Sequence, residues 1–197
     1  SQAGGAEKLQ GVKVKNNVIE NARLEVTDIT IETQEAAEKL GRPVGRYITL
    51  TATDSTFDMY SDSFRERAEV IAKAIGELCG SCERFLAVGL GNYALTSDAV
   101  GPLTAEKIFA TRHIKSLAKE LDTDDLGEVT VIQPGVLGNT GIESSEQVKA
   151  IAERVTPQAI IAVDALACSE LSNLGRTIQL CNTGISPGSG VENARKE

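Results

Sequence analysis

The chain contains few of the residues on which common enzyme mechanisms depend: its 197 residues include one histidine, four cysteines and no tryptophan. A Ser-His-Asp or Cys-His arrangement would have to use His113, the only histidine. Cys79 and Cys82 form the only C-x-x-C pair, but they end a predicted helix, whereas redox pairs start one. A zinc site would need more ligands nearby, so we expect reduced thiols, no metal and no cofactor. The sequence assigns no role to His113 or Cys168.

The chain also lacks an excess of positive charge and a long apolar run. Twenty Lys and Arg against 28 Asp and Glu give a net charge of −8, which predicts no direct binding to nucleic acid or to an anionic membrane. No stretch approaches the roughly 20 consecutive apolar residues that span a bilayer. The first ten residues, SQAGGAEKLQ, lack the apolar core of a signal peptide. We therefore expect a cytoplasmic protein in which residues 1–10 form a flexible arm.

Two kinds of hydrophobic periodicity are present in the first 80 residues. Alternating β-branched residues predict strands at 24–31 and 47–52, with a short helix between them that Gly41 and Pro43 end. Residues 63–79 repeat apolar side chains at helical spacing and predict a long helix. Its expected buried face consists of Phe64, Ala68, Ile71, Ile75 and Leu78.

From residue 85 onward, apolar strands alternate with helices. The expected strands are 85–90, 129–132 and 159–163, and the expected helices are 102–108 and 144–155. Continuous apolar strands in this alternation are typical of a parallel sheet that helices cover on both faces. We therefore predict a single α/β domain over residues 1–197, with three layers and a mostly parallel (mixed) sheet. Ligand sites in such folds form beyond the carboxyl ends of the strands.

Two aspartates occupy such positions. Asp98 lies where the loop after the first of these strands becomes a helix, so it is either a catalytic group or an N-cap. Asp164 ends the apolar strand IIAVD, and the alternatives to catalysis are an ion pair with Arg176 or a cap on the next turn. Two carboxylates that converge from separate strand ends can share a proton and activate a water, which allows peptide hydrolysis without a metal or a nucleophilic side chain.

The loops at these strand ends are rich in glycine. Gly89, Gly91 and Ala94 match the dinucleotide-binding fingerprint formally, but helix-forming residues start only near Asp98 and no acid follows about 20 positions later, which disfavours nucleotide binding. Such loops can instead point backbone N–H groups at a substrate carbonyl or an oxyanion, or they can be ordinary turns. The candidate residues are Gly89, Gly91, Asn92, Gly135, Gly138, Gly141, Thr183 and Gly184.

Five segments follow one another along the chain: GLGNYALTSDAVGP, ATRHI, PGVLGNTGIES, IIAVDALACS and NTGISPGSGV. Together they resemble the successive motifs of the spore germination protease family, in that family's order and close to its spacing. GVKVKNN and GRPVGRYITLTA resemble the stretches that precede the first motif in that family. The resemblance therefore spans residues 11–197, and its motifs are specific.

This resemblance implies an endopeptidase that degrades small acid-soluble spore proteins during germination, in the cytoplasm of the spore core. It implies an α/β fold similar to that of the hydrogenase maturation peptidases, a homotetramer, and a zymogen that removes its own propeptide. It also implies two essential aspartates, because the family's D-A-[LV]-G-P motif falls on Asp98 and its [IV]-D-A-L-A motif falls on Asp164. The related maturation peptidases bind a metal with an added histidine. His113 is not placed after a matching later strand, which favours a metal-free aspartate mechanism.

Two departures from the family pattern concern the ends of the chain. The N-terminus lacks the propeptide pattern of a full zymogen, and the family continues beyond the final GVENARKE. We therefore expect a piece of a longer protein, from which the C-terminal part of the family's chain is absent. Two other functions stay open at this point: a metal-dependent maturation peptidase that trims another enzyme, and a non-catalytic α/β module that binds a nucleotide or a peptide.

Overall fold

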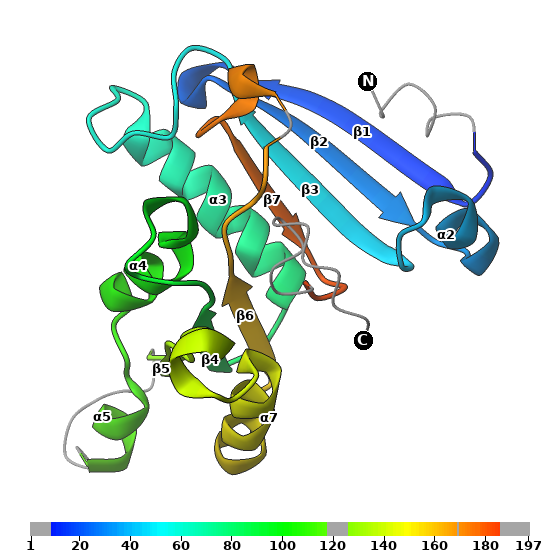
Figure 1. Ribbon diagram of the computed structural model, residues 1–197. Helices are drawn as coiled ribbons and strands as arrows, with labels where there is room; N and C mark the ends of the chain where they lie inside the picture. Colours follow the sequence, from blue (N-terminus) through cyan, green and yellow to red (C-terminus); the bar gives the residue numbers. More distant parts are fainter. Residues whose placement is uncertain (1–8, 118–125, 169, 186–197) are drawn as a thin grey trace. The chain divides into compact units, whose positions relative to one another are not determined.

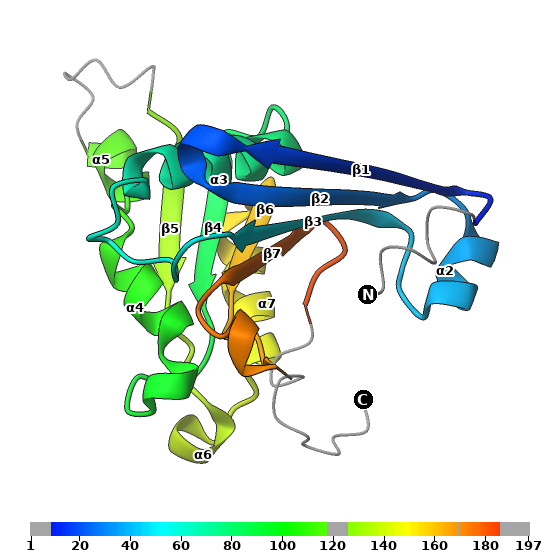
Figure 2. The same cartoon turned by 90° about the horizontal axis from the view of Figure 1, so that it is seen from above.

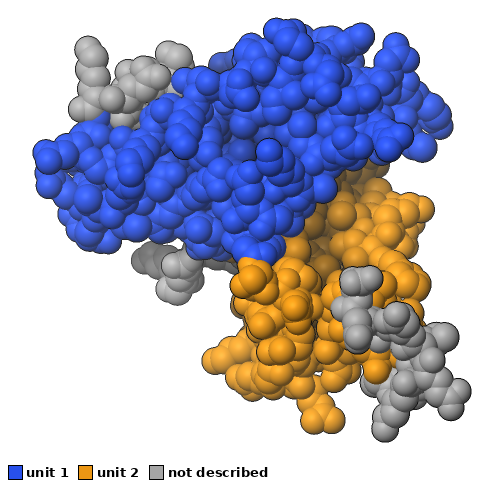
Figure 3. All heavy atoms as spheres, turned by 180° about the vertical axis from the view of Figure 1, so that it is seen from behind, with its two compact units in different colours: residues 1–80, 168–184 blue, residues 81–167, 185–197 orange. Residues whose placement is uncertain are grey.

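The computed structural model describes residues 9–117, 126–168 and 170–185 (Figure 1). These residues fall into two compact units, each coloured separately in Figure 3. Unit 1 comprises residues 1–80 and 168–184, and unit 2 comprises residues 81–167 and 185–197. The expected flexible arm at residues 1–10 lies almost entirely outside the described residues.

Unit 1 contains a four-stranded antiparallel sheet in the order β1-β2-β3-β7. Its strands are β1 (Val12–Ile19), β2 (Leu24–Ile31), β3 (Gly45–Ala52) and β7 (Thr177–Cys181). The alternation in β3 places Ile48, Leu50 and Ala52 on one buried face. The predicted strands at 24–31 and 47–52 are confirmed as β2 and β3.

Two helices accompany this sheet. Helix α2 (Gln34–Leu40) begins after Thr33, whose hydroxyl accepts the N–H of Ala36 at 3.3 Å, and it ends at Gly41 in the left-handed conformation, as predicted. Helix α3 (Phe64–Cys79) packs on the buried face of the sheet, and the predicted long helix is confirmed. Its buried face differs from the prediction, because Phe64 is half exposed and Ala68 is exposed. The residues that face the core are Arg67, Val70, Ile71, Ala74 and Leu78.

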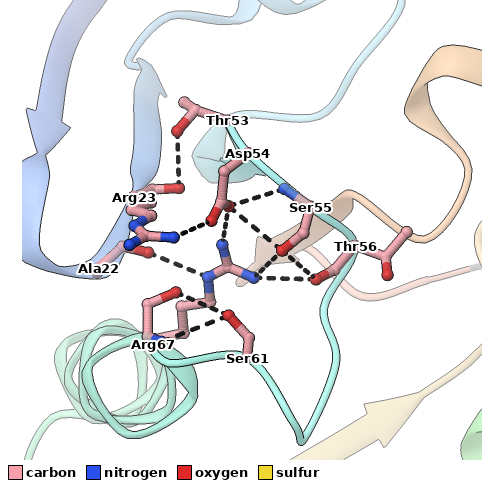
Figure 4. A network of polar contacts seen from close by, with 9 residues as sticks. Ala22, Arg23, Thr53, Asp54, Ser55, Thr56, Ser61 and Arg67 are labelled. Atoms are coloured by element: carbon pink, nitrogen blue, oxygen red, sulfur yellow. Dashed lines mark hydrogen bonds and ion pairs between the residues drawn. The ribbon is translucent and has the colours of Figure 1, made fainter.

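The guanidinium of Arg67 explains this rotation of α3, because the side chain is buried and needs polar partners (Figure 4). Arg67 donates to the carbonyl of Ala22 at 3.0 Å, to the carbonyl of Thr56 at 2.9 Å, and to the carboxylate of Asp54. Arg23 donates to the same carboxylate at 2.7 Å. The hydrogen bond from Arg23 lowers the pKa of Asp54 well below its ordinary value. Helix α3 is thereby joined to the start of β2 and to the loop after β3.

Unit 2 contains a three-stranded parallel sheet in the order β5-β4-β6 (Figure 2). Its strands are β4 (Arg84–Gly89), β5 (Glu128–Ile132) and β6 (Ala159–Val163), and its helices are α4 (Val100–Lys107), α5 (Arg112–Leu117), α6 (Leu137–Thr140) and α7 (Ser144–Val155). Leu86, Val88 and Leu90 pack against α7, whereas Gly89 faces Ala105 of α4. The three predicted strands and two predicted helices of this region are confirmed.

The expected single, mostly parallel sheet is wrong. The described residues have mixed α/β content and form one antiparallel and one parallel sheet. The cause lies in the connection from β2 to β3, which contains a helix and therefore looks like a crossover between parallel strands. Helix α2 lies at the end of the two strands and returns the chain alongside β2, so β3 pairs antiparallel to it (Figure 1). The three-layer arrangement, the single domain and the likeness to hydrogenase maturation peptidases stay predictions.

Candidate active site

Both candidate aspartates follow strands of the parallel sheet in unit 2. Asp98 is the last residue of η2 (Thr96–Asp98), a 3₁₀ helix in the loop that follows β4, and Asp164 directly follows β6. Strands β4 and β6 are neighbours, with Gly89 opposite Val163. Their carboxyl ends lie at one edge of the sheet, so the two aspartates belong to the same region of unit 2.

Asp98 is held by the loop that precedes it. The backbone N–H of Asn92 donates to the Oδ2 atom of Asp98 at 2.8 Å and to its carbonyl at 3.1 Å. The N–H of Leu95 donates to the carbonyl of Asn92, and the N–H of Asp98 donates to the carbonyl of Leu95. The Asn92 side chain accepts the N–H of Ala94 at 3.0 Å. Residues 92–98 therefore form a loop closed by hydrogen bonds, with the Asp98 carboxylate at its junction.

Gly91 allows this closure. Its φ of +114° lies in the region that favours glycine, and a Cβ atom there would lie 2.1 Å from the backbone oxygen of Asp98. The same Cβ would lie 3.1 Å from the Oδ1 atom of Asp98. Any side chain at position 91 would thus displace the backbone and the carboxylate of Asp98.

The capping alternative for Asp98 is wrong. Helix α4 begins at Val100, its N-cap residue is Ala99, and no side chain caps it. The Asp98 carboxylate accepts the N–H of Asn92 instead. The late start of α4 also agrees with the sequence argument against the dinucleotide fingerprint, which requires a helix that begins within the glycine run.

Asp164 is half-buried, and its Oδ1 atom accepts the N–H of Ala165 at 2.9 Å. Within the described ranges 9–117, 126–168 and 170–185, neither Asp98 nor Asp164 forms an ion pair. The alternative of a salt bridge from Asp164 to Arg176 therefore has no support in these residues. Both carboxylates keep lone pairs available for a water or a substrate.

A short stretch of backbone connects the positions of the two aspartates. The N–H of Leu90 donates to the carbonyl of Val163, the residue before Asp164, at 2.8 Å. The N–H of Asn92 donates to Asp98. Two residues of extended chain span at most about 7 Å, so these two anchoring points lie close together. The site can therefore present two carboxylates from a common edge.

Helix α4 fixes this edge through a second glycine. A Cβ atom on Gly101 would lie 2.1 Å from the carbonyl oxygen of Leu90 and 2.5 Å from that of Val163. Gly89 is buried beneath the same helix, where a Cβ atom would lie 2.3 Å from the carbonyl oxygen of Gly101. The backbones of α4, β4 and β6 thus approach more closely than side chains would allow.

A pocket of about 130 Å³ opens beside the closed loop. Its lining residues come from three segments of unit 2 and are Gly91, Asn92, Tyr93, Pro102, Gln133, Gly135 and Asn139. Gly91, Asn92 and Gly135 were candidates from the sequence. Tyr93, Pro102, Gln133 and Asn139 were not, because no local pattern distinguishes a pocket wall from an ordinary loop.

The remaining sequence candidates lie in different surroundings. Gly135 has a φ of +74°, and its carbonyl accepts the Ser144 hydroxyl at 2.9 Å. Gly138 lies within α6, and Gly141 ends that helix in the left-handed conformation. Thr183 and Gly184 follow β7 in unit 1. The roles proposed for these residues stay predictions.

The histidine and the cysteines lie outside the closed loop. His113 is exposed in the first turn of α5, and no disulfide joins Cys79, Cys82, Cys168 or Cys181, all of which lie among the described residues. No group of three or more His, Cys, Asp or Glu side chains that could hold a metal occurs among the described residues. No helix in the described part of the chain is both long and apolar enough to cross a membrane.

Comparison with known proteins gives a consistent result. The family model described as germination protease matches residues 2–197. The germination protease of Clostridium perfringens is 38% identical over 193 residues, which cover 96% of this chain and 58% of that relative. The germination protease of Clostridium tetani is 38% identical over 98% of this chain and 59% of its own length. That of Priestia megaterium is 38% identical over 96% of this chain and 52% of its own length. The chain thus spans little more than half the length of these relatives.

Proposed function

The chain belongs to the germination protease family, and on this premise we propose that it forms the catalytic part of an endopeptidase that degrades small acid-soluble spore proteins. The sequence motifs resemble those of the same family. The substrate class comes from that resemblance, and the names of the relatives support the peptidase activity.

The proposed chemistry uses Asp98 and Asp164 as a pair. One carboxylate takes a proton from a water as the water attacks the scissile carbonyl, and the other, protonated, polarises that carbonyl. Asp98 is assigned as the ionised partner, because a backbone N–H donates to its carboxylate and α4 begins two residues later. Asp164 then supplies the proton.

The single observation that supports this proposal most is the anchoring of both aspartates to one short strand end. The N–H of Leu90 donates a hydrogen bond to the carbonyl of the residue before Asp164, and the N–H of Asn92 donates one to the carboxylate of Asp98. Neither carboxylate is neutralised by an ion pair within the described residues, so both are available for acid–base chemistry.

The setting of this activity is also proposed. A germination protease that acts on small acid-soluble spore proteins would work in the cytoplasm of the spore core. A homo-oligomer, a tetramer as in the family, would be the assembled form. No direct contact with nucleic acid or membrane is proposed, since the net charge of −8 opposes binding to anionic surfaces.

Incubation of the full-length protein that contains this chain with purified small acid-soluble spore protein tests the proposal. Mass spectrometry should find discrete internal cleavage products. The Asp98→Asn and Asp164→Asn variants should fold and yield none. An exposed aspartate of unit 1 provides the control, because Asp62→Asn makes the same chemical change outside the site. Normal cleavage by either folded site variant would refute the paired-aspartate mechanism.

A further inference from the structure

Asn92 is held in the closed loop by both its backbone and its side chain. Its backbone N–H donates to the Oδ2 atom of Asp98 at 2.8 Å, so this N–H, which the sequence offered as a group for an oxyanion, is already occupied. Its side-chain oxygen accepts the N–H of Ala94 at 3.0 Å, which closes a turn of a kind that asparagine commonly forms. The position and the rotation of the Asn92 carboxamide are therefore both fixed.

The NH₂ group of Asn92 is the part of the side chain that this turn does not use. Because the oxygen faces the N–H of Ala94, the NH₂ group on the same carbon points to the other side. Among the residues that the structure describes, none accepts a hydrogen bond from this NH₂ group. An aspartate or a serine would close the same turn with an oxygen alone. Asn92 thus presents a fixed donor that the local structure does not need.

The scissile peptide bond of a substrate must lie close to this donor. Asn92 and Asp98 are both half-buried, and Asn92 lines the pocket beside the closed loop. A water held by the Asp98 carboxylate lies about 3 Å from it, and the carbonyl carbon that the water attacks lies about 3 Å further on. The carbonyl group is therefore within about 6 Å of the carboxylate to which Asn92 itself is bonded.

The other polar side chains of the pocket are less suited to bind this carbonyl. Tyr93, Gln133 and Asn139 are exposed, and no hydrogen bond to a residue in the described part of the chain fixes their side chains. A donor that is oriented before the reaction needs no reorganisation when negative charge develops on the carbonyl oxygen. The hydrogen bonds of Asn92 to Asp98 and Ala94 provide this orientation.

We propose that the side-chain NH₂ group of Asn92 is an oxyanion donor in peptide hydrolysis; the inference rests on the proposed peptidase function. As the water oxygen bonds to the carbonyl carbon, a water proton passes to Asp98 and the π-electron pair of the carbonyl moves onto its oxygen. That oxygen accepts hydrogen bonds from the Asn92 NH₂ group and from protonated Asp164. When the carbonyl re-forms, the C–N bond breaks, and the leaving nitrogen takes the proton from Asp98.

Kinetics of Asn92→Ser in the full-length protein test this role. The serine hydroxyl can still accept the N–H of Ala94 and adds no charge beside Asp98, but it cannot replace the NH₂ donor. With a peptide that contains the mapped cleavage site of spore protein, kcat should fall by about a hundredfold or more and KM should stay within about twofold. Asp58→Ser is the matched control, because exposed Asp58 closes the same kind of turn in unit 1 by accepting the N–H of Tyr60 at 2.9 Å. Its kinetics should match those of the native protein.

A change in the substrate distinguishes a donor from a residue that only shapes the loop. Replacement of the scissile carbonyl oxygen by sulfur gives a thioamide, whose sulfur is the weaker hydrogen-bond acceptor. If Asn92 donates to this atom, the ratio of kcat/KM for the amide to that for the thioamide should be about tenfold smaller in Asn92→Ser than in the native protein. Asp58→Ser should keep the native ratio. The same ratio in Asn92→Ser would overturn the proposal, because a purely structural role slows both substrates equally.

The native protein provides a measurement that does not depend on how the variant folds. In a crystal structure of the full-length protein with a phosphinate analogue of the cleaved peptide bond, the Asn92 Nδ2 atom should lie within about 3.2 Å of a phosphinyl oxygen. An Nδ2 atom directed away from the phosphinate would overturn the proposal. Thermal unfolding of Asn92→Ser and Asp58→Ser checks that both variants are folded.

The native protein also separates failure of the donor role from failure of the peptidase function. Cleavage by the native protein together with unchanged kcat in folded Asn92→Ser refutes the donor role alone. If the native full-length protein cleaves neither spore protein nor its peptides, the peptidase function fails and the donor role of Asn92 fails with it.

Discussion

The backbone N–H of Asn92 donates a hydrogen bond of 2.8 Å to the Oδ2 atom of Asp98. The two residues lie six positions apart in the sequence and are in direct contact in the structure. The carboxylate of Asp98 is therefore oriented by a backbone N–H group rather than by another side chain. Gly91 makes this contact possible, since a Cβ atom there would lie 2.1 Å from the Asp98 backbone oxygen. The local loop therefore decides the orientation of the carboxylate.

The two aspartates should act as one unit. Asp98→Asn and Asp164→Asn should each reduce turnover of spore protein by about a thousandfold or more, and the double variant should cost little more than either single one, because one proton-transfer step needs both groups. Initial rates with purified substrate measure this double-mutant cycle. Losses that multiply would indicate that the two residues act in independent steps.

Gly91→Ala should lower kcat strongly and KM little. The new methyl group meets the Asp98 backbone, and the φ of +114° is strained for alanine, so the carboxylate is displaced. Gly76→Ala is the matched control, since this residue lies in unit 1, a Cβ atom there would have no neighbour within 4 Å, and φ is not in the left-handed region. Steady-state kinetics on both variants, with circular dichroism as a check of folding, test this. Equal kinetics of the two variants would contradict the orientation role of Gly91.

Gly101→Ala should destabilise the protein, whereas Gly76→Ala should not. Both glycines lie in helices, but a Cβ atom on Gly101 would lie 2.1 Å from the Leu90 carbonyl oxygen, and nothing lies within 4 Å of the one on Gly76. We expect Gly101→Ala to lower the free energy of unfolding by about 1–3 kcal/mol. Gly76→Ala should raise the free energy of unfolding by up to about 1 kcal/mol, because alanine has the higher helix propensity. Urea denaturation measures both, and a neutral Gly101→Ala would show that α4 is less closely packed on the strand ends.

Arg67→Met should lower the free energy of unfolding by about 3 kcal/mol, because it leaves Asp54 and two carbonyls without their buried donor. Arg65→Met is the control: Arg65 is exposed and pairs with Glu69 one turn away, a contact worth at most about 0.5 kcal/mol. Denaturant unfolding at neutral pH compares the two. A similar small effect for both would mean that the network around Arg67 contributes little.

The same network predicts how stability depends on pH. The hydrogen bond from Arg23 lowers the pKa of Asp54 in the folded state. The stability that ionised Asp54 contributes is therefore fully present above its pKa in the unfolded chain, near pH 4, and is lost as the pH falls toward its pKa in the folded state. The stability difference between the native chain and Asp54→Asn should therefore be constant from about pH 5 to 7 and should narrow below about pH 4. Unfolding curves across this pH range measure the difference in unfolding free energy between the two proteins. A difference that widened in acid would contradict a lowered pKa of Asp54.

The sequence by itself determined the local elements, because periodicity and end residues act over a few positions. Patterns in the chain predicted the limits of α7 and β6, the end of α2 at Gly41, and the positions of Asp98 and Asp164 after apolar strands. These features depend on which face of a segment is apolar and on which residues adopt a left-handed turn. The family motifs then supplied the pairing of the two aspartates.

Only the tertiary structure decided which segments meet. Strand β7 pairs with β3 although Thr51 and Thr177 are far apart in the chain, and this pairing adds a fourth antiparallel strand to the first sheet. The buried guanidinium of Arg67 rotates α3 away from its apparent apolar face. Asp98 accepts a hydrogen bond from Asn92 and leaves α4 uncapped by a side chain. For β7 and for Arg67 the hydrogen-bond partner comes from a distant segment, and for Asp98 it comes from the same loop, six residues away. A one-dimensional pattern specifies faces and ends but not the partners that folding brings within about 3 Å.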